Sequence, residues 1–128
     1  MTKYVALSIV SPHGGNIAAG RKTIEVRSWV PPTLPIKDLL IVENTNFLTD
    51  GFQVDPNGRA VALVDVRLVE PWLPSQVEPA CSSGWQPGYF AWHLENVRSL
   101  ASTGRVWAKR KFYELSCLMQ GLSLDDPS

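Results

Sequence analysis

Cationic, acidic and aromatic side chains alternate with apolar ones in a short stretch around residue 25. The stretch reads Gly20-Arg21-Lys22-Thr23-Ile24-Glu25-Val26-Arg27-Ser28-Trp29. Side chains alternate between the two faces of a strand, so Ile24 and Val26 are expected to face the core. The opposite, outward face then carries Thr23, Glu25, Arg27 and Trp29. Lys22 lies at the turn before the strand and can point to either face.

This outward row has the chemistry of a nucleotide site. The guanidinium group of Arg27 offers a planar fork of donors to a phosphate or to a base edge. Trp29 offers a stacking face, and Glu25 can accept from a base amino group or orient Arg27. The alternative is a surface ion pair between strands, which contributes less than about 1 kcal/mol to stability.

The residues before this stretch predict a short helix with an anion site at its start. Ser11 is expected to cap the helix and Pro12 to take its first position, and Gly20 follows as a left-handed terminal residue. The free N–H groups of Gly14 and Gly15 would then accept a phosphate or carboxylate, and Ser11 and His13 join the candidate binding residues. The alternative is that Ser11 and water satisfy these donors.

Catalytic chemistry is a second use of the same residues. A buried Lys22 beside Glu25 can serve in general acid/base catalysis, because desolvation favours the neutral form of a lysine. Hydroxyl nucleophiles need a base within hydrogen-bond reach, and the candidates are Ser8, Ser11 and Thr23. The two histidines and two cysteines have no metal-ligand spacing, so no metal or other cofactor is predicted.

Basic residues also gather near the C-terminal end of a neutral chain. The net charge is zero, but residues 98–111 contain five basic residues and no acidic one. A basic patch would form if the fold brought them to residues 21–27. Lys109, Arg110 and Lys111 would alternate across a strand, where they either follow a nucleic-acid backbone beside Trp107 or Tyr113 or form an ordinary exposed strand.

Short β-forming segments separated by turns dominate the sequence and predict a small, mainly β (α+β) barrel. Turn signals occur at Asp50-Gly51, within 55–58 and within 101–104, and 73–88 is expected to be a long loop. The continuous apolar character of Arg59–Glu70 indicates burial on both faces or a bulge. Five or six strands are expected, at residues 4–10, 23–28, 38–43, 59–70, 89–98 and 105–115, with one or two short helices.

The 128 residues suffice for one domain, expected over 1–120, followed by a flexible tail over 121–128. A hydrophobic content of 45% and a mean hydropathy of -0.04 fit a globular protein. No apolar run approaches the roughly 20 residues of a membrane helix, and the first one is too short for a secretory signal. Sparse cysteines favour the cytoplasm.

The motif Gly-x-Lys-x-x-Glu-x-Arg, together with the strand and helix before it, resembles the ASCH domain, a PUA-like β-barrel family associated with RNA. The matching residues are Ala6-Leu7-Ser8-Ile9, Ser11-Pro12 and 20–29, and the 92–97 segment resembles a later strand of the family. The resemblance implies that Gly20, Arg21, Lys22, Glu25 and Arg27 line a ligand cleft. Trp92 and Asn96 are candidates for a base-stacking wall and a polar contact, with a core position as the alternative for Trp92.

The resemblance implies a protein that binds RNA or a modified nucleoside. The alternative is a hydrolase, since one branch of the family resembles amidohydrolases that deacetylate a modified cytidine, and another member type behaves as a ribonuclease. The lysine of the amidohydrolase branch corresponds to Lys22, whereas Glu25 stands where that branch has its threonine. A module that binds only proteins is the third interpretation, and its single positive feature is the Trp-rich segment around Trp85.

Overall fold

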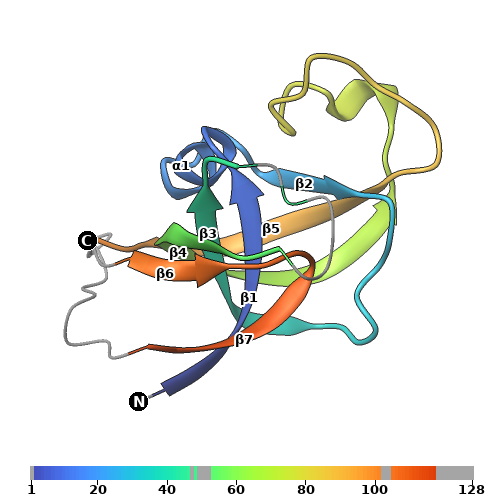
Figure 1. Cartoon of the computed structure of the whole chain (residues 1–128). Helices are drawn as coiled ribbons and strands as arrows, with labels where there is room; N and C mark the ends of the chain where they lie inside the picture. The colour runs from blue at the N-terminus through green and yellow to red at the C-terminus, as the bar shows by residue number, and fades with distance from the viewer. Residues whose placement is uncertain (1, 47, 49–52, 102–104, 118–128) are drawn as a thin grey trace.

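The protein is built on one strongly curled sheet that forms a half-open barrel (Figure 1). The computed structural model describes residues 2–46, 48, 53–101 and 105–117. The elements in chain order are β1 (Thr2–Val10), α1 (His13–Ala18), β2 (Ile24–Arg27), β3 (Ile36–Asn44), β4 (Asp55–Pro71), the 3-10 turn η1 (Pro74–Gln76), β5 (Phe90–Ser99), β6 (Arg105–Ala108) and β7 (Phe112–Cys117). The predicted fold class, a small and mainly β barrel with little helix, is confirmed.

The long strand β4 organises the sheet. The strand order is β2-β5-β4-β3-β1-β7, and β6 pairs with β4 outside this path. The start of β4 pairs with β6, and the remainder pairs with β5. Register shifts after Leu63 and after Val66 confirm the predicted bulge, which lets so long a strand bend with the barrel.

Two hydrophobic clusters fill the two faces of the sheet. One packs around Leu7, Ile41 and Trp92 and includes Ile17 of α1, which is why a helix of six residues is stable here. The other packs around Leu40 and Leu63 on the opposite face. The continuous apolar character of β3 and β4 therefore reflects burial on both faces, as expected.

Residues 105–115, expected to form one strand, do not form a continuous strand. They divide into β6 and β7 at a turn, where Lys111 has a φ of 59°. The described residues therefore form seven strands and not five or six. Lys109, Arg110 and Lys111 project from this turn and do not alternate along a strand.

One donor at the start of α1 is bound within the protein. Pro12 and not Ser11 is the capping residue, and it makes no side-chain capping bond. The Gly15 N–H donates to Oε2 of Glu43 at 2.7 Å. An internal carboxylate thus occupies the Gly15 N–H, one of the two donors that were predicted to bind a ligand anion at this helix end. Gly20 has a φ of +79°, which confirms its terminal role.

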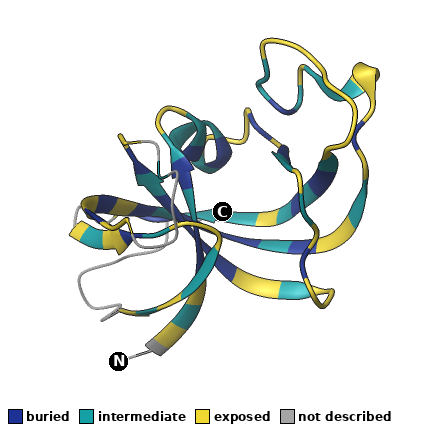
Figure 2. Ribbon diagram, turned by 45° about the vertical axis from the view of Figure 1, so that its right-hand side comes forward, coloured by how far each residue is buried: buried dark blue, intermediate teal, exposed yellow. Residues whose placement is uncertain are grey.

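The segment between β4 and β5, residues 72–89, projects from one end of the barrel (Figure 1). Apart from η1 it has no regular structure, as predicted for a long loop. Most of it is exposed (Figure 2). Trp72 and Ala80 of this segment are buried. The turns expected at Asp50-Gly51 and 102–104 and the tail over 121–128 lie outside the described residues. No helix in the described ranges has the length and apolar character needed to cross a membrane.

Candidate functional site

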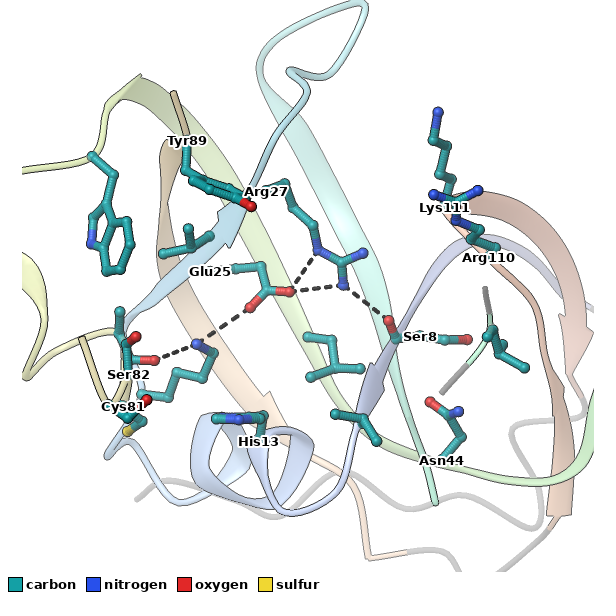
Figure 3. A pocket seen from close by; sticks show the side chains of 18 of the residues that line it. Ser8, His13, Glu25, Arg27, Asn44, Cys81, Ser82, Tyr89, Arg110 and Lys111 are labelled. Carbon is teal, nitrogen blue, oxygen red and sulfur yellow. Dashed lines mark hydrogen bonds and ion pairs between the residues drawn. The ribbon is translucent and has the colours of Figure 1, made fainter. Parts of the chain in front are cut away.

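A cleft of about 830 Å³ opens between one end of the barrel and the 72–89 segment. Its lining comes from the end of β1, from α1, from β2, from the residues after β3, from the 72–89 segment and from the turn between β6 and β7. Sequence-distant segments thus form one concave surface (Figure 3). The cleft contains the predicted motif residues Lys22, Glu25 and Arg27 together with His13.

A buried carboxylate between two cations forms one wall of this cleft. Lys22 is 4% exposed and Glu25 is 6% exposed. Nζ of Lys22 lies 3.3 Å from Oε1 of Glu25 and donates to the Ala80 carbonyl at 2.5 Å. On the other side, Arg27 donates from Nε to Oε2 of Glu25 at 2.8 Å. Burial makes these contacts mutually dependent, because each charge needs its partner once water is excluded.

Arg27 connects this group to the opposite side of the barrel. Its Nη2 donates to the Ser8 carbonyl at 3.0 Å, and the Ser8 hydroxyl lies 2.8 Å from the Tyr113 hydroxyl. Tyr113 in turn donates to the Trp107 carbonyl at 3.0 Å. The polar chain therefore runs from β2 through β1 and β7 to β6, and it fixes the Arg27 guanidinium at the edge of the cleft.

The alternation predicted for β2 is confirmed, and Ile24 is buried in an apolar cluster as expected, but the opposite face is not outward, since Glu25 is also buried. Glu25 and Arg27 line the cleft. Trp29, a predicted stacking residue, is not in the cleft lining and packs into the core edge-on against Trp92, with ring centroids 4.9 Å apart. Ile24 and Val26 pack against Trp72 and Ala80 of the 72–89 segment, and Val26 also reaches the cleft lining. The segment folds back over β2 and buries this apolar face.

A basic turn lies across the cleft from the Tyr89 side. Figure 3 shows Arg110 and Lys111 opposite Tyr89, with Arg27 and Glu25 between them. The cleft lining has five cationic side chains and one anionic side chain, a net charge of +4, in a chain of net charge zero. The predicted meeting of residues 21–27 with the basic segment is thus found for Lys109, Arg110 and Lys111.

Aromatic side chains that sequence reasoning did not assign to the site line the cleft from the 72–89 segment. Trp85 and Tyr89 are partly exposed and border the cavity. The indole N–H of Trp85 donates to the Trp72 carbonyl at 2.9 Å, which fixes the orientation of its ring. The Trp-rich composition of this loop was the available signal, but the sequence does not show that the loop folds over the motif.

His13 contributes a polar atom without an internal partner. It lines the cleft from the first residue of α1, and its Nδ1 is buried and makes no hydrogen bond with any described residue. His93, the second histidine, lies elsewhere with Nε2 2.8 Å from Glu70, as expected for a hydrogen-bonded histidine. Within the described ranges, no group of three His, Cys, Asp or Glu side chains could hold a metal ion.

Several other predicted residues lie outside the cleft lining. Trp92 is completely buried in the core, so it cannot present a stacking face. Asn96 is exposed and donates to Asp65 at 3.1 Å in a separate surface cluster with Arg98. Gly20, Arg21 and Ser11 border the cleft without lining it, and the Arg21 side chain bonds to Asn16.

Asp65 of the surface cluster has a shifted acidity. Partial burial raises its pKa, but the Asp38 N–H, the Asn96 amide and the charges of Arg98 and Lys37 outweigh this effect. The pKa of Asp65 therefore lies below its ordinary value of 3.8. Arg98 also bonds to Asp38, so this member of the basic segment is neutralised away from the cleft.

Among the described residues, the hydrogen bonds of the candidate hydroxyl nucleophiles do not include one to an activating base. The Ser8 hydroxyl bonds to Tyr113, whose own proton goes to a backbone carbonyl. Thr23 donates its backbone N–H to Pro79 and stands outside the cleft lining, as does Ser11. The arrangement is better suited to holding an anionic, planar ligand than to covalent catalysis through a hydroxyl.

Comparison with known proteins places this geometry in a family. A model of the ASCH domain matches residues 7–104. Among solved structures, a mutant ZmASCH protein from Zymomonas mobilis is similar, with 13% identity, a TM-score of 0.48 and coverage of 82% of this chain and 76% of that one. No curated protein matches the sequence. Because the matched region includes the motif strand, the cleft loop and most of the sheet, the chain belongs to the ASCH domain family.

Proposed function

We propose that this protein binds RNA and seats one nucleotide in the cleft beside Lys22, Glu25 and Arg27. The observation that carries the proposal is the charge of the cleft, +4 in a protein of zero net charge. Basic side chains concentrated in a concave site attract a phosphate-bearing ligand without giving the whole molecule an affinity for polyanions. The family, which is associated with RNA, supports the same ligand class.

Arg27 is the proposed contact to the phosphate or the base edge. Its Nε and Nη2 are occupied by Glu25 and Ser8, whereas its Nη1 makes no hydrogen bond with any described residue. The side chain is 20% exposed, which leaves this donor accessible from the cleft. Lys22 and Glu25 then act as positioning residues, since their contacts hold the guanidinium in one orientation.

The two sides of the cleft supply the remaining parts of a nucleotide site. Trp85 and Tyr89 offer partly exposed rings on which a base can stack. Each base stacked on an aromatic side chain contributes about 1–3 kcal/mol to binding. Across the cleft, Lys109, Arg110 and Lys111 are placed to contact the phosphate groups.

The test is the affinity of the variants for a fluorescently labelled single-stranded RNA, measured by anisotropy. Tyr89→Ala should weaken binding about tenfold, because a stacking surface is lost. Leu68→Ala, which removes an exposed apolar side chain from β4 outside the cleft, is the matched control and should bind like the wild type. Equal affinity of Tyr89→Ala and the control would contradict the proposed base position.

A hydrolase acting on a modified nucleoside is the second candidate, and the buried Lys22–Glu25 pair favours it. Such a pair within a cleft can transfer protons to and from a bound substrate. Incubation with N4-acetylcytidine and with short RNAs distinguishes the two functions. Turnover that disappears in both Lys22→Ala and Glu25→Ala would support a hydrolase, and binding without turnover would support the RNA-binding protein.

We further propose that the protein acts in the cytoplasm. Cys81 is a free thiol at the cleft, where it donates to the Arg21 carbonyl at a distance of 3.7 Å. A free cysteine bordering a binding site is compatible with a reducing compartment. RNA is also available there.

A further inference from the structure

The exposed face of β6 combines an aromatic ring with closely spaced cations outside the cleft. Trp107 is 58% exposed, which is unusual for a side chain of this size. Arg105, two residues earlier and therefore on the same face, is also exposed. Arg59 of β4 pairs directly with Arg105 across the strands and is exposed as well.

Arg59 pairs with Glu43 of β3 on one side and with Arg105 of β6 on the other, and the two opposed arginines are unfavourable for the sheet. Like charges at such cross-strand positions destabilise a sheet, because their β-carbons are only about 5 Å apart. Neither Arg59 nor Arg105 forms an ion pair with any described residue. An anion placed between the two guanidinium groups would relieve this repulsion, so the pair is suited to bind one.

This face leads directly to the cleft. Val106 and Ala108 pack into the core, so Arg105 and Trp107 point to the opposite side. Lys109 is the first residue after β6, and its side chain lines the cleft. A strand advances about 3.3 Å per residue, so Arg105 and Trp107 lie about 7 Å apart along β6. The Trp107 carbonyl is also held by Tyr113, which bonds to Ser8 at the cleft.

We propose that a single-stranded RNA with one nucleotide in the cleft continues across this face of β6. A neighbouring base stacks on Trp107, and a phosphate lies between Arg59 and Arg105. The inference rests on the proposed function, since it extends the same bound strand. An exposed indole flanked by arginines suits single-stranded nucleic acid better than an acidic peptide, because a peptide carboxylate leaves the ring face unused.

The experiment compares a trinucleotide with a single-stranded RNA on the order of ten nucleotides, a length within the range that such grooves accommodate. Trp107→Ala should weaken binding of the longer RNA about tenfold and leave the trinucleotide affinity unchanged. The double variant Arg59→Ser/Arg105→Ser should have the same selective effect. Leu68→Ala and Arg67→Ser, which alter exposed side chains on β4 away from this face, are the controls.

Four results would overturn the inference. Unchanged affinity of Trp107→Ala for the longer RNA, while Tyr89→Ala loses affinity, would reject the β6 surface and leave the cleft function standing. If Trp107→Ala lost the same affinity for the trinucleotide and for the longer RNA, the effect would be general, and the β6 surface would again be rejected. Absence of binding of either RNA to the wild-type protein would reject both proposals. An unlabelled poly-glutamate peptide that displaces the longer RNA at equal charge concentration would indicate a protein-like acidic partner instead.

Discussion

The structure of the candidate site depends on Glu25, because its carboxylate neutralises the charges of two cations in a buried position. Lys22 and Arg27 both contact its carboxylate, and Lys22 is almost completely buried. Replacing Glu25 by the isosteric Gln leaves both cations without their counter-ion. Removing one partner of a buried ion pair costs about 3–5 kcal/mol, so Glu25→Gln should lower the free energy of unfolding by about 3 kcal/mol in a urea titration.

A second variant separates the charge effect from a packing effect. Glu25→Gln combined with Lys22→Met removes one of the uncompensated charges and should recover part of the lost stability. Arg67→Ser serves as the control for loss of an ion pair, because the Arg67–Glu95 pair is on the surface. A loss below about 0.5 kcal/mol for Glu25→Gln, which is typical of surface changes, would contradict the described role of Glu25.

Asp65 gives a prediction for the pH dependence of stability. Its pKa in the folded protein is below the ordinary value of 3.8, because hydrogen bonds and nearby cations outweigh partial burial. The ionised form therefore stabilises the fold above that ordinary value, and this contribution is lost as the pH falls through the lowered folded pKa. At neutral pH the Asp65→Asn variant should have a lower Tm than the wild type in thermal unfolding. This difference in Tm should become smaller below about pH 4. A deficit independent of pH would contradict this account.

Single residues also show how far the sequence can predict the site. The alternation of Ile24, Glu25 and Val26 is a local property of a strand, and the sequence predicts it correctly. That both faces of β2 are covered depends on the 72–89 segment, which packs on Ile24 and brings Ala80 against Lys22 over a separation of 58 residues. No local pattern encodes that contact. Strand alternation alone therefore placed Glu25 and Arg27 on an outward face, and only the family resemblance implied a cleft.

Among the elements, α1 shows how a glycine-rich turn can serve packing and not ligand binding. Glu43 of β3 lies close to α1. A β-carbon added to Gly14 would lie 2.8 Å from Cβ of Glu43, whereas a β-carbon added to Gly15 would have its nearest neighbour, Oε2 of Glu43, at 3.5 Å. Gly14→Ala should therefore lower stability by about 1–3 kcal/mol through overpacking. Gly15→Ala is the matched control and should be neutral or raise stability by up to about 1 kcal/mol, because alanine favours the helix.

Equal stability of these two alanine variants, measured by denaturant unfolding, would contradict the described contact with Glu43. The sequence predicts the helix and its end at Gly20 from local signals. It cannot predict that the glycines admit an internal carboxylate, because Glu43 comes from a strand 28 residues away.

The turn between β6 and β7 is the element that the sequence predicts least well. Lys109, Arg110 and Lys111 contain neither glycine nor proline, and Lys111 nevertheless has a φ of 59°. A continuous strand was the natural expectation for such a segment. The turn is imposed by pairing, since β6 joins β4 while β7 joins β1, and this division is what points the basic residues toward the cleft.

For the whole molecule, the distribution of charge matters more than its sum. A net charge of zero excludes a general attraction to nucleic acid, and composition alone therefore carries no sign of an RNA partner. Folding gathers cations from β2 and from the β6–β7 turn around one cleft, while the acidic residues pair elsewhere, as Asp38 and Asp65 do with Arg98. The central claim is that this concentration of charge recognises RNA phosphates.

The salt dependence of RNA affinity tests that claim most directly. Contact with about three phosphates of a single strand predicts that log affinity falls with log salt at a slope near −2. The variant with Lys109, Arg110 and Lys111 all replaced by Ser should have a much shallower slope and weaker binding at low salt. An affinity that does not change with salt in the wild type, or a slope that the triple variant leaves unaltered, would contradict the account.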